Sequence, residues 1–133
     1  MTVVDASVVV AGLIDDGPEG RWAADLLADP LLAAPHLLPV EVAQILRRLV
    51  RAGSLSADVA VLALEDLSDL ALPLHSFGPY ADRVWELRDT VTAYDAWYVA
   101  VAESFDVPLA TLDRKLAKAP GPRCDFRMPT GRG

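Results

Sequence analysis

Short runs of apolar residues alternate along this chain with longer segments in which apolar residues recur at helical spacing. The short runs, which we predict to be strands, cover residues 2–5, 31–35, 72–77, 106–113 and 124–128. The longer segments, which we predict to be helices, cover residues 19–28, 39–53, 56–69, 78–90 and 92–105, with a short basic helix at 114–119. Because parallel strands need long crossover connections, this alternation predicts an α/β fold with a parallel sheet covered on both faces.

The opening stretch VVDASVVVAGLI places a carboxylate inside an apolar run. It begins as a strand at Thr2–Asp5, and the apolar residues resume at Val8. An ionised carboxylate in such a place is costly unless something neutralises it. We therefore interpret Asp5 as interrupting a buried strand, and we expect a neutralising group beside it.

The length of 133 residues indicates one domain spanning residues 1–133, with a short flexible tail at about 129–133. Hydrophobic residues make up 53% of the chain, which excludes a disordered protein. No apolar run is long enough to span a membrane, and Asp5 comes too early in the first run for a signal peptide. The single cysteine, Cys124, excludes an internal disulfide framework, so we expect the protein to be cytoplasmic.

The net charge of −7 is distributed unevenly along the chain. Residues 1–112 hold 17 acidic and 6 basic side chains, whereas residues 113–133 hold 2 acidic and 6 basic ones. An acidic body argues against a protein that coats nucleic acid, because such a protein carries a broad basic face. The basic C-terminal segment fits a local phosphate-binding patch and ordinary solvated charge equally well.

Four acidic residues, Asp5, Glu41, Asp95 and Asp113, share one kind of setting. Each lies where a predicted strand ends or a predicted helix begins, and each has apolar neighbours. Taken singly, each has an ordinary explanation as a cap or as a charge at a helix N-terminus. In a parallel α/β sheet, however, the carboxyl ends of the strands meet at one edge, where ligands bind. We therefore expect the four carboxylates to face one another.

Carboxylates that share a pocket of low dielectric constant repel one another unless some are protonated or a cation joins them. Oxygen ligands without histidine or cysteine select hard cations, so the predicted cofactor is Mg²⁺ or Mn²⁺. Mg²⁺ that is bound through a few carboxylates keeps several water molecules, and phosphate oxygens can take their positions. Such a metal activates water and stabilises a displaced phosphoryl group, which is the chemistry of phosphodiester hydrolysis.

Four stretches together resemble a known family: VVDASVVVA at 3–11, PVEVAQILRRLV at 39–50, TAYDAWYVAVAE at 92–103 and VPLATLDRKLAKA at 107–119. Their order and spacing are similar to those of PIN domains, and more narrowly to those of VapC-type toxin ribonucleases of bacterial toxin–antitoxin pairs. The resemblance implies a three-layer α/β/α sandwich with a mostly parallel central sheet. It also implies an acidic pocket that binds Mg²⁺ or Mn²⁺ and cleaves single-stranded or looped RNA.

The resemblance gives each of the four acids a role. It implies that Asp5 and Asp95 are direct metal ligands. It implies that Glu41 and Asp113 bind the metal through water or orient the attacking water. All four are therefore candidate catalytic residues, and the presence of all four argues against a degenerate, non-catalytic member of the family.

Four further residues correspond to supporting positions of the family. Ser7, Thr92 and Thr111 lie where relatives often have a hydroxyl near the site, although Thr92 is equally well explained as the cap of its helix. Gln44 stands where many relatives have an asparagine. Because an amide is kept there, this departure concerns fine positioning rather than activity.

Recognition of RNA requires positive charge opposite the phosphates. Arg48 lies on the predicted helix of Glu41, and Arg114 and Lys115 directly follow Asp113. These three basic residues are candidates for contacts with the RNA backbone at the rim of the pocket. Ordinary surface charge is the alternative explanation for each of them.

The resemblance also implies a protein partner, a VapB-type antitoxin that lays an apolar helix in a groove and places a basic side chain in the acidic pocket. Val59, Leu62, Leu67 and Trp22 are candidates for this groove or for a homodimer contact, although such side chains more often lie in the core. We expect a homodimer with an antitoxin partner and an RNA substrate, and no membrane association.

Two other classes of function stay open. A receiver-type phosphate-transfer domain is also α/β with acids at strand ends, but Asp15 and Asp16 come too late for its paired acid and Lys115 directly follows an aspartate. A non-catalytic RNA- or protein-binding module on the PIN scaffold would use its acids only for structure. A nuclease binds the metal and cleaves RNA, a receiver only binds the metal, and a binding module does neither.

Overall fold

A parallel sheet lies at the centre of the structure, a computed structural model that describes residues 1–130. The strands are β1 (Thr2–Val4), β2 (Leu32–Pro35), β3 (Leu74–His75), β4 (Leu109–Ala110) and β5 (Phe126–Arg127). They lie in the order β3-β2-β1-β4-β5, and each neighbouring pair is parallel. The predicted α/β fold with a mostly parallel sheet is therefore confirmed.

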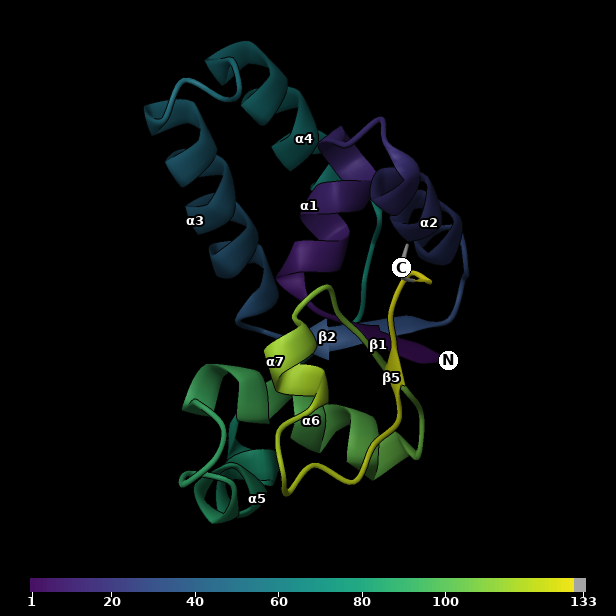
Figure 1. Ribbon diagram of the computed structural model, residues 1–133, viewed down its shortest axis with the longest axis vertical. Helices are drawn as coiled ribbons and strands as arrows, with labels where there is room; N and C mark the ends of the chain where they lie inside the picture. The colour runs from purple at the N-terminus through teal and green to yellow at the C-terminus, as the bar shows by residue number, and fades with distance from the viewer. Residues whose placement is uncertain (131–133) are drawn as a thin grey trace.

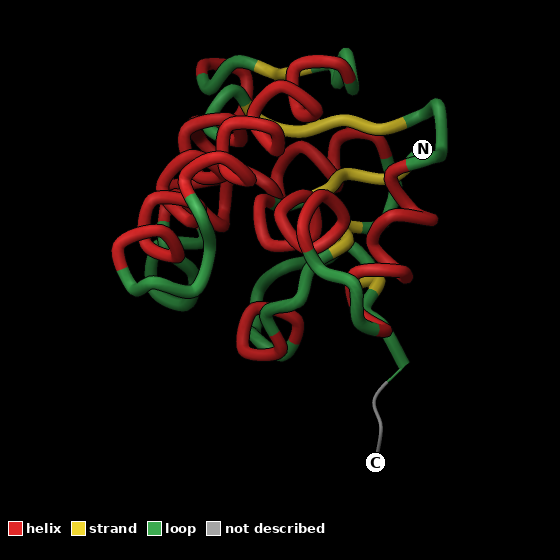
Figure 2. The backbone as a smooth tube through the Cα atoms, turned by 90° about the horizontal axis from the view of Figure 1, so that it is seen from above, coloured by secondary structure: helices red, strands yellow, loops and turns green. Residues whose placement is uncertain are grey.

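Helices cover both faces of the sheet (Figure 1). On one side lie α1 (Ala6–Ile14), α2 (Pro18–Leu27), α3 (Leu38–Arg51) and α4 (Ala57–Asp69). On the other side lie η1 (Gly78–Tyr80), α5 (Ala81–Glu86), α6 (Ala93–Phe105) and α7 (Arg114–Ala117). Figure 2, a view from above, shows the strands in yellow among the helices in red. Within residues 1–130, no helix is both long and apolar enough to cross a lipid bilayer.

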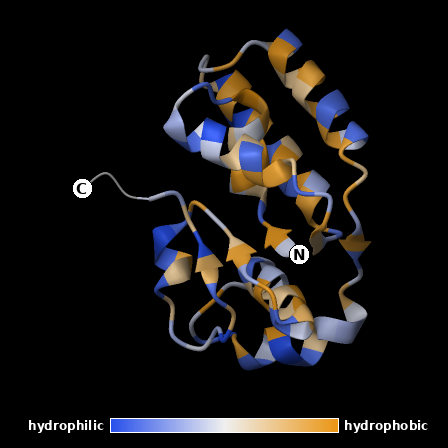
Figure 3. Ribbon diagram, turned by 90° about the vertical axis from the view of Figure 1, so that its right-hand side faces the viewer, coloured by the Kyte–Doolittle hydropathy of each residue, from blue (hydrophilic) through white to orange (hydrophobic). Residues whose placement is uncertain are grey.

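The hydrophobic core lies on both faces of the sheet. All of β1 is buried, as are Val8 and Val9 of α1 and Val99 and Val101 of α6. Helix α6 packs directly on β1, β2 and β4, whereas α1 packs on α2, α3 and α4. The strands are largely hydrophobic, as their colour in Figure 3 shows. The loops that leave the strands therefore stand on a rigid base.

The residues after Asp5 form helix α1, so the interpretation of Asp5 as an interruption of a buried strand is wrong. Asp5 directly follows β1 and is the N-cap of α1, with an extended backbone (φ −91°, ψ 171°). Its side chain accepts a hydrogen bond from the amide of Val8 at 3.2 Å, which satisfies one free donor of the first helical turn. Valine has a low intrinsic helix propensity, but the burial of the valines at 8–10 outweighs it.

Several elements of the structure are shorter than the segments predicted for them. In the predicted strands 72–77 and 106–113 only two residues each belong to the sheet, because the chain turns away to η1 and α7. The helix predicted at 78–90 is divided into η1 and α5, with Pro79 in the 3-10 turn. Of the tail expected at about 129–133, residues 131–133 lie outside the described residues.

Helix α4 exposes apolar side chains of a kind that more often lies in the core. Val59 and Leu62 are 42% and 58% exposed, and Leu67 is only partly buried. The buried residues of α4 are instead Ala60 and Ala63. Helix α4 packs against α1 and α3 and buries these small side chains, and several of its larger apolar residues are left at the surface.

Candidate active site

The four predicted acids lie at the carboxyl edge of the sheet. Asp5 follows β1 and Asp113 comes after β4, while Glu41 and Asp95 lie in the first turns of α3 and α6. The negative charges of Asp113, Glu41 and Asp5 all raise the pKa of Asp95. The structure therefore gathers the four carboxylates within electrostatic reach of one another, and their catalytic role stays a prediction.

We call the group formed by Asp5, Glu41, Asp95 and Asp113 the acidic edge. Asp5 is its buried member, with 8% of its surface exposed. One carboxylate oxygen accepts hydrogen bonds from the Ser7 hydroxyl at 2.5 Å and from the Val8 amide, and the other accepts one from the Thr111 hydroxyl. Burial raises the pKa of Asp5, although the hydrogen bonds from Ser7 and Thr111 oppose this effect. The site thus holds a carboxylate that would be stabilised by a nearby positive charge.

Ser7 and Thr111 connect Asp5 to the loop after β4. The Ser7 hydroxyl accepts a hydrogen bond from the Leu112 amide at 3.2 Å, and the Thr111 hydroxyl accepts one from the Asp113 amide at 3.0 Å. Because each hydroxyl accepts from the backbone, its own proton is free to be donated to Asp5. The two predicted hydroxyls therefore fix the position of Asp5 relative to Asp113.

Asp95 and Asp113 line a cavity of about 500 Å³ between α6 and α7. Thr92 and Lys115 line the same cavity. Thr92 is also the N-cap of α6, because its hydroxyl accepts a hydrogen bond from the Asp95 amide at 3.1 Å. Burial, followed by the charges of the other three acids, raises the pKa of Asp95 to about 6.

Glu41 is held by a tyrosine that we did not predict as a site residue. The hydroxyl of Tyr98, a core residue of α6, donates a hydrogen bond of 2.7 Å to Oε1 of Glu41. Burial and the charge of Asp5 raise the pKa of Glu41, whereas the Tyr98 hydrogen bond and the charge of Arg48 lower it. The signal in the sequence is the spacing of Tyr98 three residues after Asp95, which places both on one face of a helix.

The other predicted side chains are distributed unequally around the acidic edge. Arg48 acts electrostatically on Glu41, and Lys115 lines the cavity of Asp95. Gln44 is exposed one turn after Glu41 on α3. Arg114 instead lines a separate cavity of about 490 Å³, whose other lining residues are Asp15, Gly17, Pro18, Glu19, Trp22, Pro129 and Thr130.

The donor set fits a hard cation that is held through few direct ligands. Within residues 1–130, no group of three or more histidine, cysteine, aspartate or glutamate side chains is arranged so that it could hold a metal ion. The acidic edge nevertheless offers carboxylate oxygens whose mutual repulsion and burial favour a cation. Mg²⁺ characteristically binds through one or two carboxylates and keeps water in its other positions. The residues therefore fit Mg²⁺ or Mn²⁺ held by one or two direct ligands, with other contacts through water.

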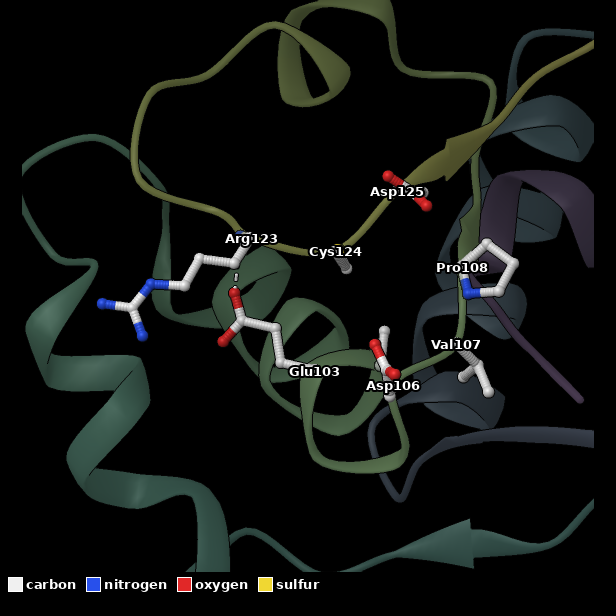
Figure 4. Close-up of a pocket in the computed structure, with 8 residues that line it drawn as sticks. Glu103, Asp106, Val107, Pro108, Arg123, Cys124 and Asp125 are labelled. Atoms are coloured by element: carbon white, nitrogen blue, oxygen red, sulfur yellow. Dashed lines mark hydrogen bonds between the residues drawn. The ribbon is translucent and has the colours of Figure 1, made fainter.

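A second acidic region lies at the opposite edge of the sheet. Figure 4 shows a cavity of about 270 Å³ near the end of α6, with Glu103, Pro108 and Asp125 among its lining residues. Pro108 and Asp125 directly precede β4 and β5, so this cavity lies at the amino ends of the strands. The acids of this region are thus separated from the acidic edge by the sheet itself.

Comparisons with known proteins agree with this geometry. The sequence matches the PIN domain family over residues 2–122. Ribonuclease VapC1 of Mycobacterium tuberculosis is 41% identical over 127 residues, which cover 95% of this chain and 96% of that protein. PAE2754 from Pyrobaculum aerophilum has a TM-score of 0.72 at 24% identity, covering 94% of this chain and 81% of that one. A member of the VapBC family of toxin–antitoxin systems, VapBC-5 from Mycobacterium tuberculosis, has a TM-score of 0.54 at 23% identity, covering 96% and 95%.

The chain therefore belongs to the PIN-domain family. Its identity to ribonuclease VapC1 over nearly the whole length of both proteins places it among the VapC-type members.

Proposed function

We propose that this protein is a metal-dependent endoribonuclease toxin, which hydrolyses RNA phosphodiester bonds and is inhibited by a VapB-type antitoxin. The observation that carries the proposal is the acidic edge of Asp5, Glu41, Asp95 and Asp113. Within residues 1–130, the ion pairs are those of Arg83 with Glu86 and Glu103, so no basic side chain pairs with these four acids. Repelling carboxylates without such a partner are suited to a divalent cation.

Asp5 and Asp95 are the proposed direct ligands of Mg²⁺ or Mn²⁺. Asp5 is held in place by Ser7 and Thr111, and Asp95 faces the cavity beside α7. A cation bound there would lower the pKa of a water molecule and neutralise charge on the phosphate under attack. Glu41 and Asp113 would accept hydrogen bonds from this water and so orient it towards the phosphorus.

The basic residues around the edge are proposed to hold the RNA backbone. Lys115 lines the same cavity as Asp95 and Asp113. Arg48 is exposed on α3 near Glu41, and Arg114 points into the neighbouring cavity. Replacing these side chains by neutral ones should reduce the affinity for RNA more than it reduces the rate at which bound RNA is cleaved.

The direct test is cleavage of a structured RNA pool by the purified protein in Mg²⁺, in Mn²⁺ and in EDTA. Asp95→Asn, purified in the same way, is the control for contaminating nucleases. We expect cleavage that requires the metal and disappears in the variant. Equal cleavage by the wild type and the variant in every condition would contradict the catalytic role of the acidic edge. Metal binding without cleavage would favour a receiver-type domain, and the absence of both would favour a binding module.

The antitoxin is proposed to dock on α3 and α4. An apolar groove of about 410 Å³ lies between the start of α3 and the end of α4, with Leu38, Leu64 and Leu74 among its lining residues. Leu64 of α4 is 41% exposed, so this part of the groove is open to solvent. Co-expression with a VapB-type antitoxin should yield a complex, and Leu64→Asp should abolish its co-purification without changing RNA cleavage.

We also propose that the protein is a homodimer. Exposed Val59 and Leu62 on α4 provide the apolar surface that such a contact needs. Light scattering of the purified protein tests this proposal, and a monomeric mass at micromolar concentration would contradict it.

A further inference from the structure

Tyr98 joins two helices at the acidic edge. Its ring is in the core, with 1% of its surface exposed, and its hydroxyl lies 2.7 Å from Oε1 of Glu41. The two residues are 57 positions apart in the sequence and come from α6 and α3. This hydrogen bond therefore fixes the Glu41 side chain relative to the helix that carries Asp95.

The chemistry of the pair makes Tyr98 the donor. An ionised glutamate only accepts hydrogen bonds, and a tyrosine hydroxyl that donates to a carboxylate makes a strong, charge-assisted bond. Burial, together with the bond to Glu41, raises the pKa of Tyr98 far above its usual value. The geometry of the pair therefore gives Tyr98 the donor role and Glu41 the acceptor role.

Helix α6 presents both residues on one face. Asp95 and Tyr98 are three positions apart, so they are neighbours along the helix surface. Asp95 lines the cavity beside α7, while Tyr98 contacts Glu41. A single rigid helix therefore sets the position of one acid directly and of a second acid through a hydrogen bond.

We propose that Tyr98 is a positioning residue, which acts on the reaction only by holding the Glu41 carboxylate in one orientation. The inference rests on the proposed function, because Glu41 is the group that would orient the attacking water. Because only 1% of its surface is exposed, Tyr98 itself would contact neither the cation nor the RNA. Its removal should therefore matter only as long as Glu41 carries a carboxylate.

The test is a double-mutant cycle of Tyr98→Phe and Glu41→Gln. Phenylalanine keeps the buried ring and removes only the hydroxyl, and glutamine keeps the shape of the glutamate and removes its charge. Two quantities are measured for each protein: the single-turnover rate of RNA cleavage, and the dissociation constant for Mn²⁺ by calorimetry. Tyr80→Phe is the matched control, because the Tyr80 hydroxyl also contacts α6, at Ser104, but away from the acids.

We expect Tyr98→Phe to lower the cleavage rate by about tenfold and to weaken Mn²⁺ binding by about threefold, as for other residues that orient metal-site groups. In the Glu41→Gln background the same change should alter either quantity by less than about twofold. Tyr80→Phe should match the wild type. The melting temperature of Tyr98→Phe should stay within about 5 °C of the wild type, because packing is kept.

An effect of Tyr98→Phe below about twofold, an equal loss in both backgrounds, or a larger fall in melting temperature would each overturn the positioning role. A wild type that binds Mn²⁺ but cleaves no RNA would refute the proposed function, while the calorimetric cycle would still test Tyr98. A wild type that neither binds Mn²⁺ nor cleaves RNA would overturn both.

Discussion

Helix α6 carries a partly buried acid near each end, and the two acids have opposite electrostatic settings. Asp95, in the first turn, has its pKa raised to about 6, mainly by burial and then by three other carboxylates. Burial also acts to raise the pKa of Glu103, in the last turn, but hydrogen bonds from Arg83 and from the Arg123 amide outweigh it and lower the pKa. The Arg83 guanidinium contacts both carboxylate oxygens of Glu103, at 2.7 and 3.1 Å.

The comparison shows how two acidic residues on one helix acquire a structural and a functional character. Glu103 connects α6 to α5 and, through the Arg123 amide, to the segment before β5 (Figure 4). Its charge is neutralised within the protein, so it contributes to stability. The charges that act most strongly on Asp95 are those of three other carboxylates, so ionised Asp95 reduces stability. An acid that lowers the stability of the free protein is a marker of a binding site.

The largest expected difference is in activity. Asp95→Asn should lower RNA cleavage by at least about 100-fold, because a proposed metal ligand loses its charge. The matched variant Glu103→Gln should keep the cleavage rate of folded protein within about twofold. Single-turnover cleavage assays measure both, and a comparable loss in Glu103→Gln would show that the two ends of α6 do not differ as the comparison requires.

The second expected difference is in the response to metal. Mn²⁺ at about 100 times its dissociation constant should stabilise the wild type by about 2.7 kcal/mol, since the folded protein alone provides the site. Glu103→Gln should gain as much stability from Mn²⁺ as the wild type, whereas Asp95→Asn should gain much less. Thermal unfolding with Mn²⁺ and with EDTA measures this gain. An equal gain in all three proteins would place the metal elsewhere.

The third expected difference is in the stability of the metal-free protein. Glu103→Gln should lower the free energy of unfolding by about 2 kcal/mol, because the partly buried Arg83 loses a charged partner. Urea unfolding in EDTA measures this change. Glu86→Gln is a control at the exposed partner of the same arginine, and it should cost less than about 1 kcal/mol.

The smallest expected difference is in the pH dependence of stability. The pKa of Asp95 rises from its ordinary value of 3.8 to about 6 on folding, so the folded state binds the proton more tightly. This acid therefore lowers stability as the pH rises from about 3.8 to about 6. Because water screens the half-buried carboxylate, the effect is reduced to about 1–2 kcal/mol in total.

The pKa of Glu103 is lowered on folding, so its contribution has the opposite sign. That contribution is present above its ordinary pKa of 4.5 and is lost as the pH falls. Urea unfolding in EDTA across this range should therefore show Asp95→Asn more stable than the wild type at pH 7 and similar to it below pH 4. A constant difference at all pH values would contradict the raised pKa of Asp95.

The alternation of apolar runs and helical segments predicted the parallel sheet and its two layers of helices, because these patterns are local in the sequence. The same alternation identified four acids at the ends of strands or the starts of helices. Asp5 shows the limit of this reasoning. Its position in the chain was evident, but an aspartate that ends a strand and one that interrupts it have similar local sequences, so helix α1 was missed.

Local sequence patterns could not predict contacts between residues far apart in the chain. The hydrogen bond between Tyr98 and Glu41 joins residues 57 positions apart, and that between Thr111 and Asp5 joins residues 106 apart. The pair of Arg83 and Glu103 lies on two neighbouring helices whose relative rotation no periodicity specifies. The exposure of Val59 and Leu62 likewise depends on which face of α4 meets α1 and α3.

The sequence by itself determined the class of fold, the presence of four acids at the ends of its elements and the oxygen-only chemistry that favours a hard cation. These properties follow from residue type and local spacing, which every segment carries with it. Only the tertiary structure decided which acids are neutralised and which are left to repel one another. That outcome depends on the distances between charges brought together from remote parts of the chain, and packing of the core sets those distances.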